Sequence, residues 1–274
     1  MSSKQSDVGL IFDLERAQTE LSMLLKENVI GVRMESGYNP EESSNMVLSL
    51  IIISHVSGRV LVFDVLRNPT ILQTKSFKTL LESERPIKVM FHPENECKLL
   101  WRSNRILLHG VFDPQTLYMV KEAIQKKLPT RKLGNQRKTL TEMCHLYHVE
   151  CRYDKKLVKK MFTENPSLFM ERSDMGGLMG ILEESAKCLI PLYEKMKGEL
   201  DIAVVKEKYS QMLEECLCAG LQGPDKRQFE RQKLERNYLE TKEFRKEHGN
   251  TALSKGDKYL LRRSRRHSYW ELCH

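Results

Sequence analysis

The sequence predicts an α/β fold, in which helices flank a mixed sheet and a helical extension follows. In the first part of the chain, helical patterns alternate with short runs of β-branched and apolar residues that turn residues separate. From Pro114 onward the pattern is helical throughout. A chain of 274 residues, 40% of them hydrophobic, can bury one large core together with a helical appendage.

The segment before Pro114 contains all the strands that we expect. Apolar residues recur at helical spacing over 13–27, which predicts an opening helix. Three strands, a helix that ends near Leu81, a strand, a short helix from about Asn95 and a last strand follow. The strands are expected at 29–34, 47–54, 60–65, 87–91 and 106–113. This order predicts a mixed sheet with helices on its faces.

The segment from Pro114 onward opens with a helix whose first turn holds that proline, a position where proline is favoured. Further helices are expected at about 139–148, 155–163, 178–197 with an interruption at Pro191, and 203–219. The stretch GLQGPDKRQ then precedes a helix over 225–247 that is dense in both signs of charge. The expected parts are therefore an opening helix (1–27), an α/β domain (28–200), a helical extension (201–248) and a basic tail (249–274).

The net charge of +8 is concentrated in one segment. Residues 121–160 hold twelve Lys or Arg and four Asp or Glu, which equals the excess of the whole chain. Such concentrated positive charge is typical of a surface that binds a polyanion, and an ordinary solvated helical surface is the alternative. The candidate phosphate contacts are Lys126, Lys127, Arg131, Lys132, Arg137 and Lys138.

The seven cysteines lie at irregular spacings, and no secretory signal is expected from the N-terminal sequence MSSKQSDVG. We therefore expect reduced thiols and a cytoplasmic location. Cys216 and Cys218 fall on a predicted helix without a second ligand pair, so ordinary packing is favoured over zinc. The histidines at 92, 109, 145 and 148 share no metal-binding spacing with the cysteines. We expect no metal, no cofactor and no membrane span.

Five sequence fragments occur in an order that is typical of one nuclease superfamily. They are VIGVRMESG, SGRVLVFDVL, IKVMFHPENECKLLW followed by HGVFDPQTLYMV, LTEMCHLYHVE, and GLMGILEESAKCLIPLYEKM. Together, over roughly residues 10–200, they resemble the 3′-5′ exonuclease domain of the DEDD superfamily. The resemblance implies a ribonuclease H-like fold.

Active members of that superfamily hold two divalent cations with four carboxylates, and a Tyr or His orients the attacking water. The resemblance places Arg33 at the first carboxylate position, Glu35 at the second and Glu96 at the third. Ser185 stands at the fourth, and Ile181 at the water-orienting position. Charges of +1 and +2 about 4 Å apart repel by about 8 kcal/mol at an effective dielectric constant of 20. We therefore interpret the site as metal-free and non-catalytic, with Arg33 paired to Glu35 and Glu96.

Within the superfamily, the chain most resembles the inactive exonuclease 3′-5′ domain-containing proteins of piRNA biogenesis, and less closely the Egalitarian-type RNA adaptors. This resemblance implies a homodimeric scaffold that binds single-stranded RNA and the protein partners of a piRNA-processing assembly. Two alternatives stay open. One is a weak metal-dependent 3′-5′ exoribonuclease that recruits Glu183 or Glu184 as a further acid. The other is a protein–protein adaptor in mRNA transport.

Overall fold

The computed structural model describes residues 10–38, 46–127, 137–165, 167–172 and 176–218. The chain divides into two compact units, 1–219 and 220–274, and every described residue belongs to the first. The expected charged helix and basic tail therefore lie outside the described residues.

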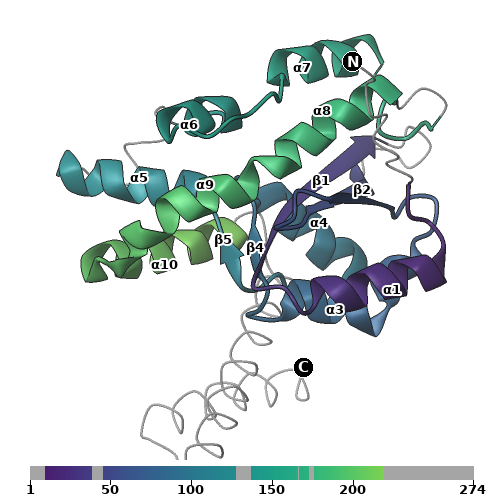
Figure 1. Ribbon diagram of the computed structural model, residues 1–274, viewed down its shortest axis with the longest axis horizontal. Coiled ribbons are helices and arrows are strands. Elements are labelled where there is room, and N and C mark those ends of the chain that lie inside the picture. Colours follow the sequence, from purple (N-terminus) through teal and green to yellow (C-terminus); the bar gives the residue numbers. More distant parts are fainter. Residues whose placement is uncertain (1–9, 39–45, 128–136, 166, 173–175, 219–274) are drawn as a thin grey trace, which may run out of the picture. The chain divides into compact units, whose positions relative to one another are not determined.

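The described unit is built on a five-stranded sheet with the strand order β3-β2-β1-β4-β5 (Figure 1). The strands are β1 (Val29–Tyr38), β2 (Met46–Ser54), β3 (Val60–Asp64), β4 (Ile87–Val89) and β5 (Val111–Phe112). The first three strands pair antiparallel, whereas β4 and β5 pair parallel to β1 and to each other. The sheet is therefore mixed, which confirms the predicted fold class.

Both faces of the sheet are covered by helices. The helices are α1 (Leu14–Leu24), α2 (Thr70–Gln73), α3 (Lys75–Glu82), α4 (Glu94–Asn104), α5 (Pro114–Gln125), α6 (Leu140–Leu146), α7 (Lys155–Glu164), α8 (Gly176–Lys187), α9 (Leu189–Met196) and α10 (Ala203–Cys218). Neighbouring residues of β3 point to opposite sides, as strand geometry requires. Phe63 meets Phe77 of α3 edge to face, whereas Val62 packs with Leu178 and Leu182 of α8. This double coverage explains why β2 is a nearly continuous apolar run.

Helices α8 and α9 cross β1 at close range, and Gly31 permits this approach. A Cβ atom at Gly31 would lie 2.3 Å from the hydroxyl oxygen of Ser54 and 3.0 Å from the carbonyl oxygen of Ala186. Ser54 in turn donates a hydrogen bond to that carbonyl, at 2.8 Å. The end of α8 is thus held against the strand that leads to the candidate site.

Two sequence expectations are corrected by the fold. The helix expected over 178–197 breaks at Cys188, not at Pro191, which lies in the first turn of α9, where its missing N–H costs nothing. The strand expected over 106–113 is limited to Val111–Phe112. Ile106, Leu107 and Leu108 before it are buried but form no strand, so their apolar pattern reflects burial and not sheet pairing.

Helix α10, which the sequence assigns to the helical extension, packs on α4 and α5. Val205 and Tyr209 are buried in the same core as Phe112, and the Tyr209 hydroxyl accepts a hydrogen bond from the backbone N–H of Asp113 at 2.8 Å. Within the described part of the chain, no helix combines the length and apolar character needed to cross a bilayer.

Candidate functional site

Strand β1 carries Arg33 and Glu35 to one end of the sheet. Residues two apart in a strand point to the same side, so both side chains project together. The register of β1 against β2 shifts between Glu35 and Ser36. Such bulges redirect the side chains that follow, and Ser36 accordingly lines the same pocket as Arg33 and Glu35.

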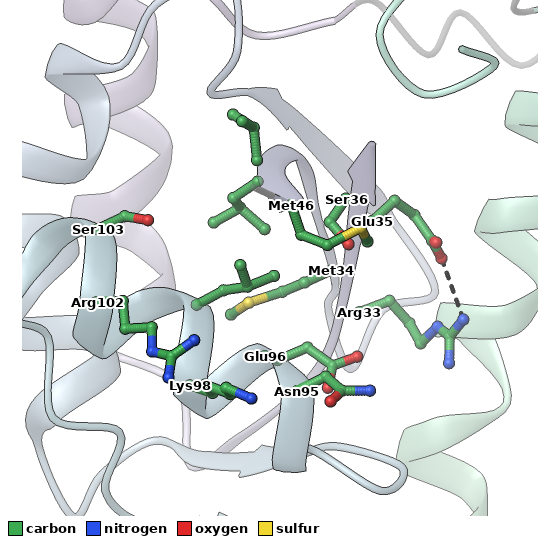
Figure 2. A pocket seen from close by; sticks show the side chains of 13 residues that line it. Arg33, Met34, Glu35, Ser36, Met46, Asn95, Glu96, Lys98, Arg102 and Ser103 are labelled. Atoms are coloured by element: carbon green, nitrogen blue, oxygen red, sulfur yellow. Dashed lines mark hydrogen bonds and ion pairs between the residues drawn. The ribbon is translucent and has the colours of Figure 1, made fainter. Parts of the chain in front are cut away.

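Helix α4 forms the opposite wall of this pocket (Figure 2). Asn95, Lys98, Leu99 and Arg102 recur at helical spacing, so one face of the helix is turned to the pocket. The pocket has a volume of about 790 Å³ and also takes in Glu96. We name it the β1–α4 pocket.

The start of α4 is held in place by Asp113. The fully buried Asp113 carboxylate caps α5 and accepts a hydrogen bond from the backbone N–H of His92 at 3.0 Å. His92 has a φ of 57°, a left-handed conformation that this bond helps to hold. Asp113 is thus a structural strand-end acid, as its position in the sequence suggests, and it fixes the loop that leads to Glu96.

Arg33 and Glu35 form an ion pair. The guanidinium Nη2 of Arg33 lies 3.1 Å from Oε1 of Glu35, and the two side chains are only 17% and 14% exposed. Arg33 also lies 5.6 Å from the ring centre of Tyr153. Burial lowers the pKa of Arg33, but Glu35, Tyr153 and Glu96 together raise it above its ordinary value. Arg33 therefore stays a cation in the site.

The expected pairing of Arg33 is confirmed for Glu35 but not for Glu96. Figure 2 shows the guanidinium group turned to Glu35, and Oε2 of Glu96 is buried without a hydrogen-bond partner. Burial raises the pKa of Glu96 to about 7, and the charge of Arg33 only partly opposes this shift. Near neutral pH, much of Glu96 is therefore an uncharged carboxyl group.

The residues present do not fit the two-cation site of the DEDD superfamily. The fully buried hydroxyl of Ser185 donates to the backbone oxygen of Leu182 at 2.6 Å, so it is engaged within its own helix. Ile181 packs on the apolar core and carries no polar atom that could orient water. The Arg33 cation pairs with Glu35, which is one of the two carboxylates that the resemblance retains. A two-cation site needs carboxylate oxygens at two positions where this chain presents a guanidinium and an engaged hydroxyl, and the water-orienting position holds only an alkyl group.

The four candidate phosphate contacts within the described residues do not line the β1–α4 pocket. Lys126 and Lys127 are exposed where α5 ends, and Lys126 pairs with Glu122 at 2.5 Å. Arg137 is exposed just before α6, and the backbone N–H of Lys138 donates to Gln115 at 2.9 Å. The remaining two candidates, Arg131 and Lys132, lie outside the described residues.

Lys98 and Arg102 belong to the pocket but were not among the sequence candidates. They share one face of α4 with Asn95 and line the same pocket as Arg33. Their spacing of four residues, immediately after Glu96, is a signal that the sequence does contain. It is weak because isolated charged pairs on helices are common on solvated surfaces.

The fold itself is that of a ribonuclease H-like 3′-5′ exonuclease domain. No protein-family model matches the sequence, and no curated protein matches it. Solved structures do match. RNase D of Trypanosoma brucei aligns with a TM-score of 0.60 at 15% identity, over 76% of this chain and 72% of that one. The same enzyme in complex with RNA U12 aligns with a TM-score of 0.60 at 16% identity, over 76% and 70%.

Two further solved structures have a similar fold. The Nibbler EXO domain of Aedes aegypti aligns with a TM-score of 0.53 at 14% identity, over 78% of this chain and 98% of that domain. The catalytic core of RRP6 from T. brucei aligns with a TM-score of 0.57 at 15% identity, over 79% and 54%. At these identities the likeness establishes the fold alone, and the residues of the site decide what the domain can do.

Proposed function

We propose that this protein is an exonuclease-like domain that binds single-stranded RNA without cleaving it. The observation that carries the proposal is the Arg33–Glu35 ion pair in the β1–α4 pocket. A fixed guanidinium replaces a carboxylate that would hold a cation, and it offers a phosphate the bidentate donor geometry that arginine favours. The fixed positive charge of Arg33 then attracts the phosphates of the RNA.

The chemistry of the β1–α4 pocket suits an RNA backbone. Arg33, Lys98 and Arg102 supply cations, whereas Glu96 is partly neutralised by its raised pKa. Within the described part of the chain, Arg33 Nε and Glu96 Oε2 are both buried without a hydrogen-bond partner. A donor and an acceptor that are both unsatisfied match the phosphate oxygens and ribose hydroxyls of a nucleotide. The complex of T. brucei RNase D with RNA U12 supports RNA as the ligand of this fold.

We further propose that the domain serves as a cytoplasmic homodimeric adaptor in a piRNA-processing assembly. The resemblance of the sequence fragments to inactive exonuclease-like proteins of that pathway supports this role. Sedimentation at micromolar concentration tests the dimer, and a mass near the 32.1 kDa of one chain would count against it. The rival functions are a weak exoribonuclease and an adaptor that works through protein contacts alone.

Reversing the two pocket cations of α4 tests the proposed RNA site. We expect Lys98→Glu with Arg102→Glu to weaken the binding of fluorescently labelled single-stranded RNA by about tenfold or more, because charge-assisted hydrogen bonds contribute about 1.5–3 kcal/mol each. The measurement is fluorescence anisotropy in the presence of EDTA, so that no divalent cation bridges protein and RNA.

The matched control reverses Lys75 and Lys78, which are exposed on α3 and do not line the pocket. This control should bind RNA nearly as tightly as the parent protein at the same salt concentration. Equal weakening by both pairs would show that only general charge matters. Unchanged binding by the pocket variant would remove the β1–α4 pocket from the proposal.

A further inference from the structure

Three cysteines that are far apart in the sequence meet in the fold. The sulfur atoms of Cys144, Cys151 and Cys188 all lie within 4.8 Å of one another. Cys144 lies in the last turn of α6, Cys151 belongs to the segment before α7, and Cys188 lies between α8 and α9. Spacing along the sequence does not indicate this cluster, because Cys188 approaches the other two cysteines from another part of the chain.

The turn after α6 brings the first two cysteines together. His148 has a φ of 55°, and the N–H of Val149 donates to the carbonyl oxygen of Cys144 at 2.8 Å. This is the hydrogen bond of a Schellman turn, which ends a helix and reverses the chain. The reversal returns Cys151 to Cys144, so the spacing of six intervening residues is matched to the turn.

The distances between the sulfur atoms suit a metal ion. Zinc binds thiolates at about 2.3 Å in a tetrahedral arrangement, which sets two such sulfur atoms about 3.8 Å apart. An upper limit of 4.8 Å between sulfur atoms therefore needs only a small closure around the ion. Three soft sulfur ligands favour zinc over the hard cations that the exonuclease superfamily uses.

A divalent cation at this position would favour the thiolate form of all three cysteines, because a coordinating thiol is deprotonated by the charge of the ion.

We propose that Cys144, Cys151 and Cys188 bind one Zn²⁺ ion through their sulfur atoms. Binding converts three thiols into thiolates and releases three protons, which leaves a group of net charge −1 near Arg33. Cys188 shares with His148 the lining of a pocket of about 450 Å³. The fourth ligand comes from this pocket and is either the imidazole of His148 or a water molecule.

The ion would join the three segments that carry Cys144, Cys151 and Cys188. Cys151 is two residues from Tyr153, whose ring lies beside the Arg33 guanidinium, and α9 packs on β1. We assign this zinc ion a structural role, since three protein sulfur atoms hold it and none of them lines the β1–α4 pocket. It stabilises the folded chain because the unfolded chain holds no preformed site.

Metal analysis of the full-length protein tests the proposal. After dialysis against metal-free buffer, we expect about one zinc per chain by mass spectrometry. Replacement by Co²⁺ should give the thiolate-to-cobalt charge-transfer absorption and the intense visible bands of a tetrahedral site. In His148→Ala the visible bands should shift if imidazole is the fourth ligand and stay unchanged if water is. Loss of the charge-transfer band in that variant would contradict the three-thiolate assignment.

Serine variants supply the controls. Cys144→Ser, Cys151→Ser and Cys188→Ser should each lose most of the zinc. Cys97→Ser removes an equally buried thiol and Cys216→Ser a half-buried one, and both should retain it. The cobalt spectrum of the unaltered protein keeps the test valid should a serine variant fail to fold. Parent protein without zinc or cobalt bands, zinc retained by the triple variant, or a disulfide among the three cysteines would overturn the proposal.

Discussion

Replacing Arg172 by leucine is expected to lower the free energy of unfolding by about 3–5 kcal/mol, the range for removing one partner of a buried ion pair. Arg172 donates to both carboxylate oxygens of Asp64, at 2.6 and 2.7 Å, and to the hydroxyl of Ser49 at 2.8 Å. Asp64 is fully buried at the end of β3. Without the guanidinium, its charge would remain in the core, where the Arg67 N–H, at 3.0 Å, would be its one remaining donor among the described residues.

The matched control for this prediction is Arg152→Leu. Arg152 also pairs with a carboxylate, that of Glu150, at 2.7 Å, but both side chains are 76% exposed. Its loss should change the free energy of unfolding far less than the loss of Arg172 does, because solvent screens an exposed ion pair. Urea denaturation measures both variants. Equal effects of the two substitutions would mean that burial does not set the strength of the Arg172–Asp64 pair.

The second large effect is expected in the basic segment. Four of its cations are replaced by glutamate in one variant: Arg131, Lys132, Arg137 and Lys138. Each phosphate that a protein neutralises on a single strand adds about −0.7 to the slope of log affinity against log salt. Four contacts give a slope of about −3 and a loss of about fiftyfold between 50 and 200 mM salt. The variant should lose this salt dependence together with its affinity for RNAs of unrelated sequence.

The control for the basic segment reverses four exposed cations elsewhere. They lie on or next to α1 and on α3: Arg16, Lys26, Lys75 and Lys78. This variant changes the net charge by the same amount, so long-range repulsion is matched. It should keep most of the salt slope of the parent protein. A quadruple variant of the basic segment that binds as tightly as the parent would leave that segment as solvated surface.

The order of strands and helices could be predicted because each element carries its own local pattern. Apolar runs and turn residues locate β1 to β4, and Pro114 locates the start of α5. The sequence pattern puts the helix interruption at Pro191, three residues after the observed break at Cys188, because proline is tolerated in a first helical turn. The break at Cys188 is a tertiary feature, at a crossing over β1 that Gly31 permits.

The candidate site was predictable only in part. The spacing of Arg33 and Glu35 along a strand requires both to share a face, so their ion pair follows from the sequence. The corresponding pair with Glu96 does not form among the described residues. This outcome could not be predicted, because the position of Glu96 depends on how α4 packs and no local pattern specifies that packing. The three-cysteine cluster was missed for a similar reason. Cys144 and Cys151 are neighbours through a turn, but Cys188 joins them only through the packing of the α8–α9 junction.

The length of bound RNA is the most direct measure of the central claim, that this exonuclease-like domain holds RNA without cutting it. Single-stranded RNA labelled at its 5′ end would be incubated with the protein in Mg²⁺, in Mn²⁺ or in EDTA. Affinity would be measured by anisotropy and length on a denaturing gel. We predict the same affinity with and without divalent cation, and full-length RNA throughout. Metal-dependent shortening from the 3′ end that disappears in Glu35→Gln would contradict the account and establish the exoribonuclease instead.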